Sequence, residues 1–269
     1  YDVIKATPFG NEMTTDFAIA AIENERLGQG EVTDFLAVSY SSTDYVGHQF
    51  GVNSVEIEDT YIRLDRDLER LFDYLDKHVG KGAYTLFLTA DHGAIQVPNF
   101  LKSQKIPAGY FDRKSFRNQL DDALEKTFGV EGLVKNVSNN QIFLDKEKIS
   151  KIEEDLDDVQ EFIAQEIIAY KHIDKVFTAE TLATTQFLKG IGYLIQNGFH
   201  QKHSGDVIFV LEPSVISYPQ TGSTHGSGLS YDTHVPLIFY GNGIKKGHTF
   251  KRTEIVDIAP TISALLGIS

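Results

Sequence analysis

Two short apolar segments separated by one long amphipathic segment are the feature that most constrains this fold. Residues 34–40, DFLAVSY, and residues 83–90, AYTLFLTA, are apolar runs of strand length. Between them, apolar side chains at helical spacing line one face of residues 55–78, and charged side chains line the opposite face. Strand, helix and strand in this order predict a βαβ unit with neighbouring parallel strands. We therefore expect an α/β fold.

The hydrophobic periodicity is lost after Ala94 and returns near Gly205, which divides the chain into three parts. Residues 1–95 are expected to form the first part of the core. Residues 96–200 contain prolines, a charged helical segment near 113–128, a short strand pair around 134–144 and a long acidic helical segment over roughly 146–170, so we predict an inserted, cap-like α+β subdomain. Residues 201–269 contain two strand-like segments, over 206–213 and 234–241, and a closing helix over 254–267. We expect them to complete the core sheet and the metal site.

Composition excludes several classes of partner. The chain has 269 residues, of which 41% are hydrophobic, so it can bury a core. It has no apolar run of membrane-spanning length, so we expect no membrane partner. The net charge of -13 argues against a nucleic-acid grip, because that grip needs clustered Lys and Arg. The absence of cysteine leaves only His and carboxylate side chains to bind an ion such as zinc.

The first motif pairs Asp44 with His48 in SSTDYVGHQFG, just after the first apolar segment. On a helix the two side chains would share one face, whereas Gly47 and Gly51 favour a loop or the start of a helix. The carboxyl end of a strand is where open α/β sheets bind ligands. By itself, however, the pattern is more typical of a polar surface pair than of a metal site.

The second motif, TADHG, places Asp91 and His92 after the second apolar segment. Adjacent residues of a strand point to opposite faces, so both can serve one site only if the backbone turns at Gly93. The alternative is a strand-end turn capped by the aspartate. An unpaired aspartate at the end of an apolar strand needs a partner, which favours the site.

The third motif, GSTHGSGLSYDTHVP, contains His225 and His234. Glycines around His225 allow a ligand to approach the backbone closely. His234 leads directly into an apolar segment, and we interpret it as a structural histidine. The remaining histidines lie in charged or polar segments and are expected at the surface: His78, His172, His200, His203 and His248.

Together the three motifs supply two aspartates and three histidines at the expected ends of core strands. This donor set suits zinc, with three protein ligands and one open position. Two such ions about 4 Å apart form the clamp used in phosphoryl transfer. Two cations would also attract an anionic substrate against the acidic charge of the chain.

The strings STDYVGH, TADHG and STHGS followed by YDTHVPLIFYG resemble those of the alkaline phosphatase superfamily. The closest resemblance is to the branch of bacterial alkaline phosphatases related to type I phosphodiesterases and nucleotide pyrophosphatases. It implies an α/β three-layer sandwich with a mostly parallel sheet and an inserted α+β subdomain. It also implies that Asp44, His48 and His225 bind one zinc, and that Asp91 and His92 belong to a second, incomplete zinc site. Polar neighbours are expected to orient these ligands: Ser42, Thr43, Thr89, Thr224 and Ser227.

The family also uses residues that this sequence does not contain. Its Thr or Ser nucleophile and a further zinc-binding aspartate precede the first motif, but the 43 residues before Asp44 show no strand followed by such a turn. We therefore expect a carboxyl-terminal fragment with no catalytic residue in this chain and a nucleophile upstream of Tyr1. The full-length parent is expected to hold two zinc ions. This chain is expected to form at most one complete zinc site and to be inactive alone.

The resemblance implies that the parent is a zinc-dependent alkaline phosphomonoesterase. Its substrate would be a small phosphate ester, and its location would be the periplasm or the extracellular space. A phosphodiesterase or nucleotide pyrophosphatase of the same superfamily is an alternative, because the metal ligands are shared. A catalytically silent metal-binding module is a third possibility. The oligomeric state stays open.

Overall fold

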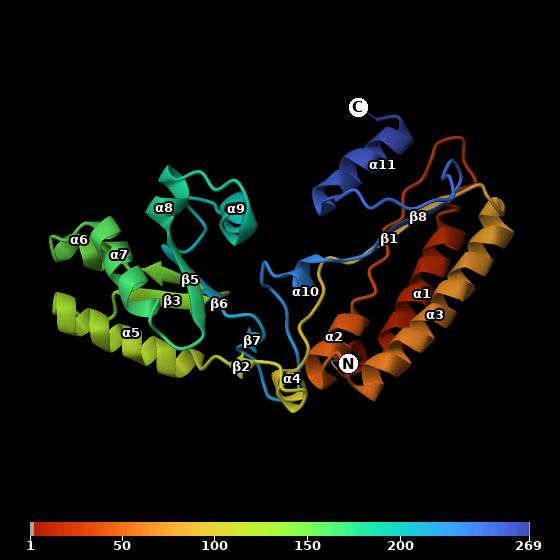
Figure 1. The fold of residues 1–269 in the computed structure, drawn as a ribbon. Helices are drawn as coiled ribbons and strands as arrows, with labels where there is room; N and C mark the ends of the chain where they lie inside the picture. Colours follow the sequence, from red (N-terminus) through yellow and green to blue (C-terminus); the bar gives the residue numbers. More distant parts are fainter. Residues whose placement is uncertain (1–2, 269) are drawn as a thin grey trace. The chain divides into compact units, whose positions relative to one another are not determined.

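The computed structural model describes residues 3–268 of a mixed α/β chain, shown in Figure 1. Its contacts separate two compact units, the first within residues 1–93 and 234–269 and the second within residues 94–233. The first two predicted motifs belong to the first unit, and His225 belongs to the second. None of the helices in the described part of the chain is long and apolar enough to cross a membrane.

The first unit is built mainly from helices. Its α-helices are α1 (Pro8–Asn24), α2 (Ser42–Phe50), α3 (Val55–Leu75) and α11 (Ile258–Leu266). Short helical turns cover Ile4–Ala6, Asp76–Gly80 and Ile255–Asp257. α1 starts at Pro8, whose fixed φ suits the first helical position. α3 starts where the Ser54 hydroxyl accepts a hydrogen bond from the backbone N–H of Ile57 at 3.2 Å.

The helices α1 and α3 lie side by side and share the small core of this unit (Figure 1). Ala18 and Ile22 of α1 and Leu71 of α3 form its buried cluster, and five apolar neighbours pack against them only partly buried. The predicted amphipathic helix over 55–78 is therefore present as α3 and the turn after it.

The strand pairing of the first unit differs from the predicted βαβ unit. β1 (Thr85–Thr89) is paired antiparallel with β8 (Leu237–Gly241), with Thr85 opposite Gly241. Residues 34–40 are not a strand, although Phe35 stacks on Phe87 of β1 with the ring centroids 6.5 Å apart. A strand requires a neighbouring backbone in register, and an apolar pattern does not specify that neighbour. The predicted parallel pairing of residues 34–40 with residues 83–90 is therefore wrong, and β1 pairs antiparallel with β8 instead.

The second unit is an α+β structure around a four-stranded antiparallel sheet with the strand order β3, β4, β6, β5. These strands are β3 (Val134–Ser138), β4 (Gln141–Leu144), β5 (Ile173–Thr178) and β6 (Val207–Leu211). A small parallel pair joins β2 (Gly109–Tyr110) to β7 (Val215–Ile216). Among the strand pairs of residues 3–268 this one alone is parallel, whereas the resemblance implied a mostly parallel sheet.

Seven α-helices accompany these strands within residues 94–233. They are α4 (Pro98–Ser103), α5 (Arg113–Phe128), α6 (Lys146–Lys151), α7 (Leu156–Ile167), α8 (Ala179–Thr184), α9 (Gly190–Gly198) and α10 (Ser230–Thr233). The single acidic helix expected over 146–170 is divided into α6 and α7. The division follows from Glu153, whose φ of 59° lies in the left-handed region that a helix cannot continue through.

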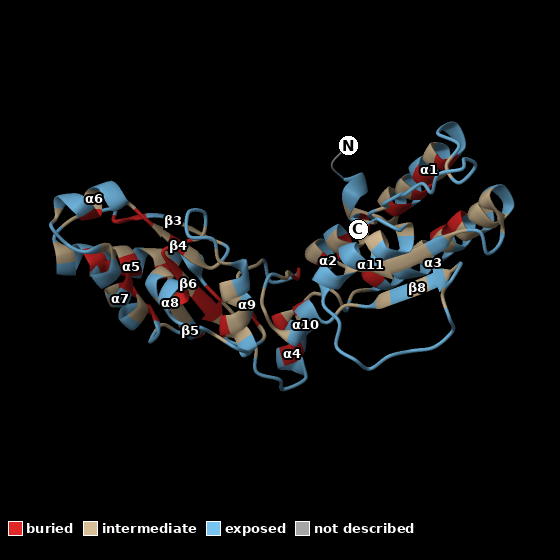
Figure 2. Ribbon diagram, turned by 90° about the horizontal axis from the view of Figure 1, so that it is seen from above, coloured by how far each residue is buried: buried red, intermediate tan, exposed pale blue. Residues whose placement is uncertain are grey.

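The core of the second unit lies between its sheet and its helices. Phe116, Leu120 and Leu124 recur every four residues along α5, so they share one helix face, and all three are buried. They pack in one cluster with side chains of α7 and of β6, including Ile163 and Phe209. Figure 2 shows these buried positions along α5, α7 and β6. Each such side chain contributes roughly 1.5–3 kcal/mol when it is fully buried.

The extent of the second unit also differs from the predicted insert of residues 96–200. Residues 201–233 were expected in the core, but they pack with the insert and bring the boundary to Thr233. The reason is β6, which forms ladders with both β4 and β5. An apolar strand pattern marks residues 207–211 as a buried strand but does not reveal which sheet receives it.

Candidate metal centre

Asp44 and His48 lie on one face of α2, because residues four apart on a helix are neighbours. The Asp44 Oδ2 atom and the His48 Nε2 atom are 3.4 Å apart. Gly47 is inside this nine-residue helix, and the helix ends at Gly51, whose φ is 86°. The expectation that Gly47 and Gly51 favour a loop or the start of a helix is therefore corrected, because a nine-residue helix runs through Gly47 and carries both side chains.

The start of α2 is held against α1. Gly10 lies so close to α2 that a Cβ atom there would overlap the Ser42 hydroxyl. Beside it, the Asn11 Nδ2 atom donates a hydrogen bond to Thr43 Oγ1 at 3.0 Å. Asn11 is almost fully buried, at 1% exposure, so the amide side of this part-buried contact is shielded from water. Thr43 immediately precedes Asp44, and α1 therefore fixes the backbone from which the Asp44 side chain projects.

The segment before α2 has a further anchor in the same unit. The Thr15 and Tyr40 hydroxyl groups are 3.1 Å apart and share a hydrogen bond. Burial raises the pKa of Tyr40 above its ordinary value, so its hydroxyl stays neutral over the physiological range. The chain therefore enters α2 through two contacts with α1, one on each side of the helix start.

Asp91 and His92 follow β1 directly, as predicted. The Asp91 Oδ2 atom lies 3.5 Å from His92 Nε2, although the aspartate side chain is 89% exposed and the histidine side chain 25%. The His92 Nδ1 atom is 2.9 Å from the Gly93 carbonyl oxygen. A carbonyl can only accept, so Nδ1 carries the proton of the neutral ring and Nε2 keeps the lone pair that binds metals.

His225 lies in the second unit, in residues 222–227, which have no regular secondary structure. On its amino-terminal side, the Ser223 hydroxyl donates to the Ile95 carbonyl, and the Ile95 N–H donates to the Thr224 carbonyl at 3.3 Å. On its carboxyl-terminal side, Ser227 is bonded to Asp232. His225 therefore lies between two anchored ends of a short loop.

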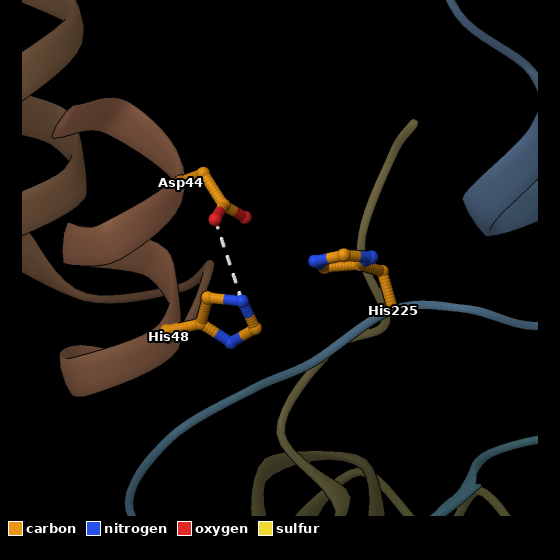
Figure 3. Close-up of side chains that lie close together, drawn as sticks. All are labelled: Asp44, His48 and His225. Atoms are coloured by element: carbon orange, nitrogen blue, oxygen red, sulfur yellow. Dashed lines mark ion pairs between the residues drawn. The ribbon is translucent and has the colours of Figure 1, made fainter. Parts of the chain in front are cut away.

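Figure 3 draws the three residues of the predicted first zinc site. Asp44 and His48 belong to the first unit and His225 to the second. Among residues 3–268, Asp91 and His92 are not part of a group of three or more clustered His and carboxylate side chains. The donor set of the predicted first zinc site is one carboxylate and two imidazoles.

The chemistry of these donors fits zinc. Two imidazole nitrogens and one carboxylate oxygen are ligands that zinc accepts in catalytic sites with an open fourth position. Ligand atoms around a tetrahedral zinc, with bonds near 2.1 Å, stand roughly 3.4 Å apart. The separation of 3.4 Å between Asp44 and His48 equals that edge, and it lies wholly within the first unit.

Among the other histidines, His172 has a role that the sequence did not indicate. Its Nδ1 atom is 2.8 Å from a Glu212 carboxylate oxygen, and its ring fills the space where a Cβ of Gly109 would lie. Its side chain is 20% exposed, so it is less exposed than the predicted surface position. His78, His200, His203 and His248 are exposed as predicted, and His234, which was interpreted as a structural histidine, is exposed as well. The partial burial of His172 depends on tertiary contacts, which leave no local sequence signal.

Similarity to known proteins places the chain in a family. Residues 2–234 match the family described as type I phosphodiesterase / nucleotide pyrophosphatase. The chain is 48% identical, over 100% of its length, to a Myroides odoratus protein named calcium-transporting ATPase, of which it covers 50%. It is 39% identical, over 99% of its length, to the alkaline phosphatase PafA of Elizabethkingia meningoseptica, of which it covers 49%. The chain thus spans about half the length of the curated relatives it matches.

Two solved structures show the same fold. The crystal structure of wild-type PafA superposes with a TM-score of 0.94 over 99% of this chain and 51% of that chain. Murine ectonucleotide pyrophosphatase / phosphodiesterase 5 superposes with a TM-score of 0.63 at 16% identity, over 95% of this chain and 60% of that chain. These matches confirm the predicted α/β class and the resemblance to the alkaline phosphatase superfamily. The chain belongs to the type I phosphodiesterase / nucleotide pyrophosphatase family.

Proposed function

We propose that this chain carries the zinc-binding part of a phosphate-ester hydrolase that acts as an alkaline phosphomonoesterase. Asp44, His48 and His225 hold one zinc ion, and Asp91 with His92 supplies two ligands to a second. The observation that carries the proposal is the separation of 3.4 Å between the Asp44 and His48 ligand atoms, because it matches the spacing of two ligands on one zinc. The similarity to alkaline phosphatase PafA supports the reaction class.

The residues of the chain have distinct tasks in this proposal. When bound, zinc supplies Lewis-acid chemistry toward a phosphoryl oxygen and toward water. Asp44 contributes the negative charge that offsets part of the dication, while His48 and His225 contribute neutral nitrogen ligands. An imidazole binds a metal only when it is neutral, so zinc binding weakens in acid, and an alkaline optimum is natural.

The second motif has a similar task but lacks a third ligand. His92 presents its Nε2 atom because Nδ1 donates to the Gly93 carbonyl, and Asp91 lies beside it. Two protein ligands bind zinc weakly, so the remaining ligand and the Thr or Ser nucleophile are assigned to the part of the relatives that lies outside the match. On this view the chain binds one zinc tightly and turns over little substrate by itself.

A phosphodiesterase or nucleotide pyrophosphatase is the second candidate function. The description of the matching family favours it, and murine ectonucleotide pyrophosphatase / phosphodiesterase 5 has been solved in complex with AMP. Both candidates act on small phosphate esters. The net charge of -13 argues against a nucleic-acid grip, and neither candidate reaction requires one. A periplasmic or secreted location, which the family resemblance implies, is part of the same proposal.

A zinc titration of the purified chain tests the metal site. We expect one tight zinc ion per chain by competition with a chromophoric chelator, and a loss of affinity of at least a hundredfold in His48→Ala. The matched control is His248→Ala, because His248 is an exposed histidine of the same unit. Equal zinc affinity in His48→Ala and the control would remove α2 from the site.

A hydrolysis assay tests the reaction. The chain alone and a form extended at its amino end to the length of the relatives are compared on a phosphate monoester and a phosphate diester, with and without zinc. We expect zinc-dependent monoester hydrolysis by the extended form. Faster diester hydrolysis would favour the second candidate, and zinc binding without hydrolysis of either ester would leave a catalytically silent metal-binding module.

A further inference from the structure

We propose that Asp232 is a positioning residue that holds the His225 loop in its metal-binding conformation. The inference rests on the proposed zinc function of His225, and it concerns contacts that lie entirely within the second unit. Asp232 itself is not assigned as a metal ligand. It acts through Ser227, which lies two residues after His225 in the chain.

The loop around His225 depends on a few hydrogen bonds. Residues 222–227 are in neither a helix nor a strand, so their backbone N–H and C=O groups are not paired in a regular hydrogen-bond ladder. On the carboxyl-terminal side of His225, the Asp232 Oδ2 atom accepts two hydrogen bonds from Ser227, from its backbone N–H at 2.8 Å and from its hydroxyl at 2.7 Å. The same hydroxyl accepts from the Leu229 N–H at 3.3 Å. One carboxylate oxygen therefore organises the whole turn after the ligand.

The carboxylate of Asp232 faces the protein interior and not the solvent. Its side chain is buried, at 4% exposure, and its Oδ1 atom is a buried oxygen without a hydrogen-bond partner. Among the described residues no ion pair joins its carboxylate to a Lys, Arg or His side chain. A buried carboxylate that is bonded only to neutral donors is costly for folding.

The short helix that carries Asp232 is itself held in place by a hydrogen bond. Asp232 lies in the short helix α10, next to Tyr231, whose hydroxyl accepts from the Ser214 N–H at 3.4 Å. Burial raises the pKa of Tyr231 above its ordinary value, so this hydroxyl stays neutral. The contact ties α10 to the residue just before β7. A fixed carboxylate that holds the carboxyl-terminal end of the loop, while Ser223 and Thr224 are bonded to Ile95 at the other end, is the arrangement expected of a group that orients a metal ligand.

The test is the zinc affinity of the purified chain in four variants. Asp232→Ala leaves both Ser227 donors without their acceptor, and we expect zinc binding to weaken roughly ten- to a hundredfold, the usual loss for a group that orients a ligand. Asp232→Asn keeps a carbonyl acceptor for Ser227, so we expect it to retain most of the affinity. Ser227→Ala removes one of the two bonds and should give an intermediate loss. The matched control is Thr233→Ala, which alters α10 at an exposed hydroxyl bonded only to the Leu229 carbonyl.

A cobalt spectrum separates positioning from simple loss of stability. Co²⁺ in the site absorbs according to the geometry of its ligands, so Asp232→Ala should change the visible spectrum, whereas Asp232→Asn and Thr233→Ala should keep that of the unmodified chain. Circular dichroism of the metal-free variants checks that each one folds. If Asp232→Ala does not fold, Ser227→Ala carries the same test, because it keeps the buried carboxylate.

The outcomes distinguish this inference from the proposed function. Unchanged zinc affinity and an unchanged cobalt spectrum in Asp232→Ala, together with a large loss in His48→Ala, would overturn the positioning role and leave the zinc site intact. Equally weak binding in Asp232→Asn and Asp232→Ala would also overturn it, because the acceptor would then not be what matters. An unmodified chain that binds no zinc would instead remove the proposed function itself.

Discussion

The two units of this protein bury their apolar side chains to very different extents. The second unit has a continuous core in which α5, α7 and the four-stranded sheet share one buried cluster. The first unit has a small cluster between α1 and α3, whereas Phe17 and Phe35 are 79% and 55% exposed and Ile238 of β8 is 52% exposed. The unit that carries Asp44, His48, Asp91 and His92 is therefore the one with less hydrophobic support.

This difference shows how the proposed ligands are held. In the second unit, position is a consequence of packing, because each core residue touches many others. In the first unit, α2 depends on a few specific contacts with α1, at Gly10 and at Asn11. We expect changes in the second unit to alter stability most, and changes at the α1–α2 contact to alter the metal site at a smaller cost in stability.

The largest expected effect comes from truncating a core aromatic residue in the second unit. Phe116 is 1% exposed, and its ring centroid lies 5.2 Å from each of the Phe111, Tyr170 and Phe209 centroids. Phe116→Ala should lower the free energy of unfolding by about 3–5 kcal/mol, because it leaves a cavity. Urea unfolding followed by circular dichroism measures the change.

The matched variant in the first unit is Phe17→Ala. Its side chain is exposed, so the free energy of unfolding should change by no more than about 0.5 kcal/mol. Equal effects of the two Phe→Ala changes would break the contrast between the units, because they would mean that Phe17 is buried as deeply as Phe116 in solution.

A smaller effect is expected from Gly10→Ala at the contact between α1 and α2. The added Cβ overlaps the Ser42 hydroxyl, so either the side chain or the helix must shift, at a cost of about 1–3 kcal/mol. Because α2 carries Asp44 and His48, zinc affinity should fall together with the urea midpoint. The control is Gly198→Ala in the second unit, where the new Cβ meets no atom within 4 Å. A loss of stability in Gly10→Ala with unaltered zinc affinity would separate α1 from the metal site.

The smallest effect concerns the alkaline stability of the first unit. Burial, followed by a hydrogen bond from its hydroxyl to Asp76 at 2.9 Å, raises the pKa of Tyr84 from 10.0 to about 12. The folded state thus favours the neutral phenol, so this stabilisation is complete below pH 10 and is lost as the pH rises from 10 to about 12.

Tyr84→Phe should remove that pH dependence. We expect the urea midpoints of the unmodified chain and of Tyr84→Phe to differ below pH 10 and to converge near pH 12. The control is Tyr61→Phe, since Tyr61 is 59% exposed on α3 of the same unit. A constant difference between the Tyr84 variant and the unmodified chain at all pH values would contradict the shifted pKa.

Much of the local structure could be predicted from the sequence. The stripe of apolar residues over 55–78 is α3 and the turn after it, and the strand-like segments over 83–90 and 206–213 contain β1 and β6. Periodicity reports these elements because each one presents a defined face to its surroundings. The pairing of the strands could not be predicted, as β1 with β8 and β6 with β5 both show, because pairing depends on chain segments that are distant in sequence.

For the candidate site, too, one part could be predicted from the sequence and another could not. The donor types of the three motifs, and hence the preference for zinc, follow from the residues themselves, since ligand chemistry does not depend on the fold. The contacts of Asn11 with Thr43 and of Asp232 with Ser227 could not be predicted, because each joins polar residues of types that are common in any loop.

By itself, the sequence determined the α/β class, the donor types of the three motifs, and the family to which the chain belongs. Only the tertiary structure decided that β1 is paired antiparallel with β8, that residues 201–233 pack with the insert, and that the buried Asp232 carboxylate organises the turn after His225. The physical reason is the range of the interactions. Helical periodicity and ligand chemistry act over a few residues, whereas strand pairing and buried hydrogen bonds join positions that only the folded chain brings together.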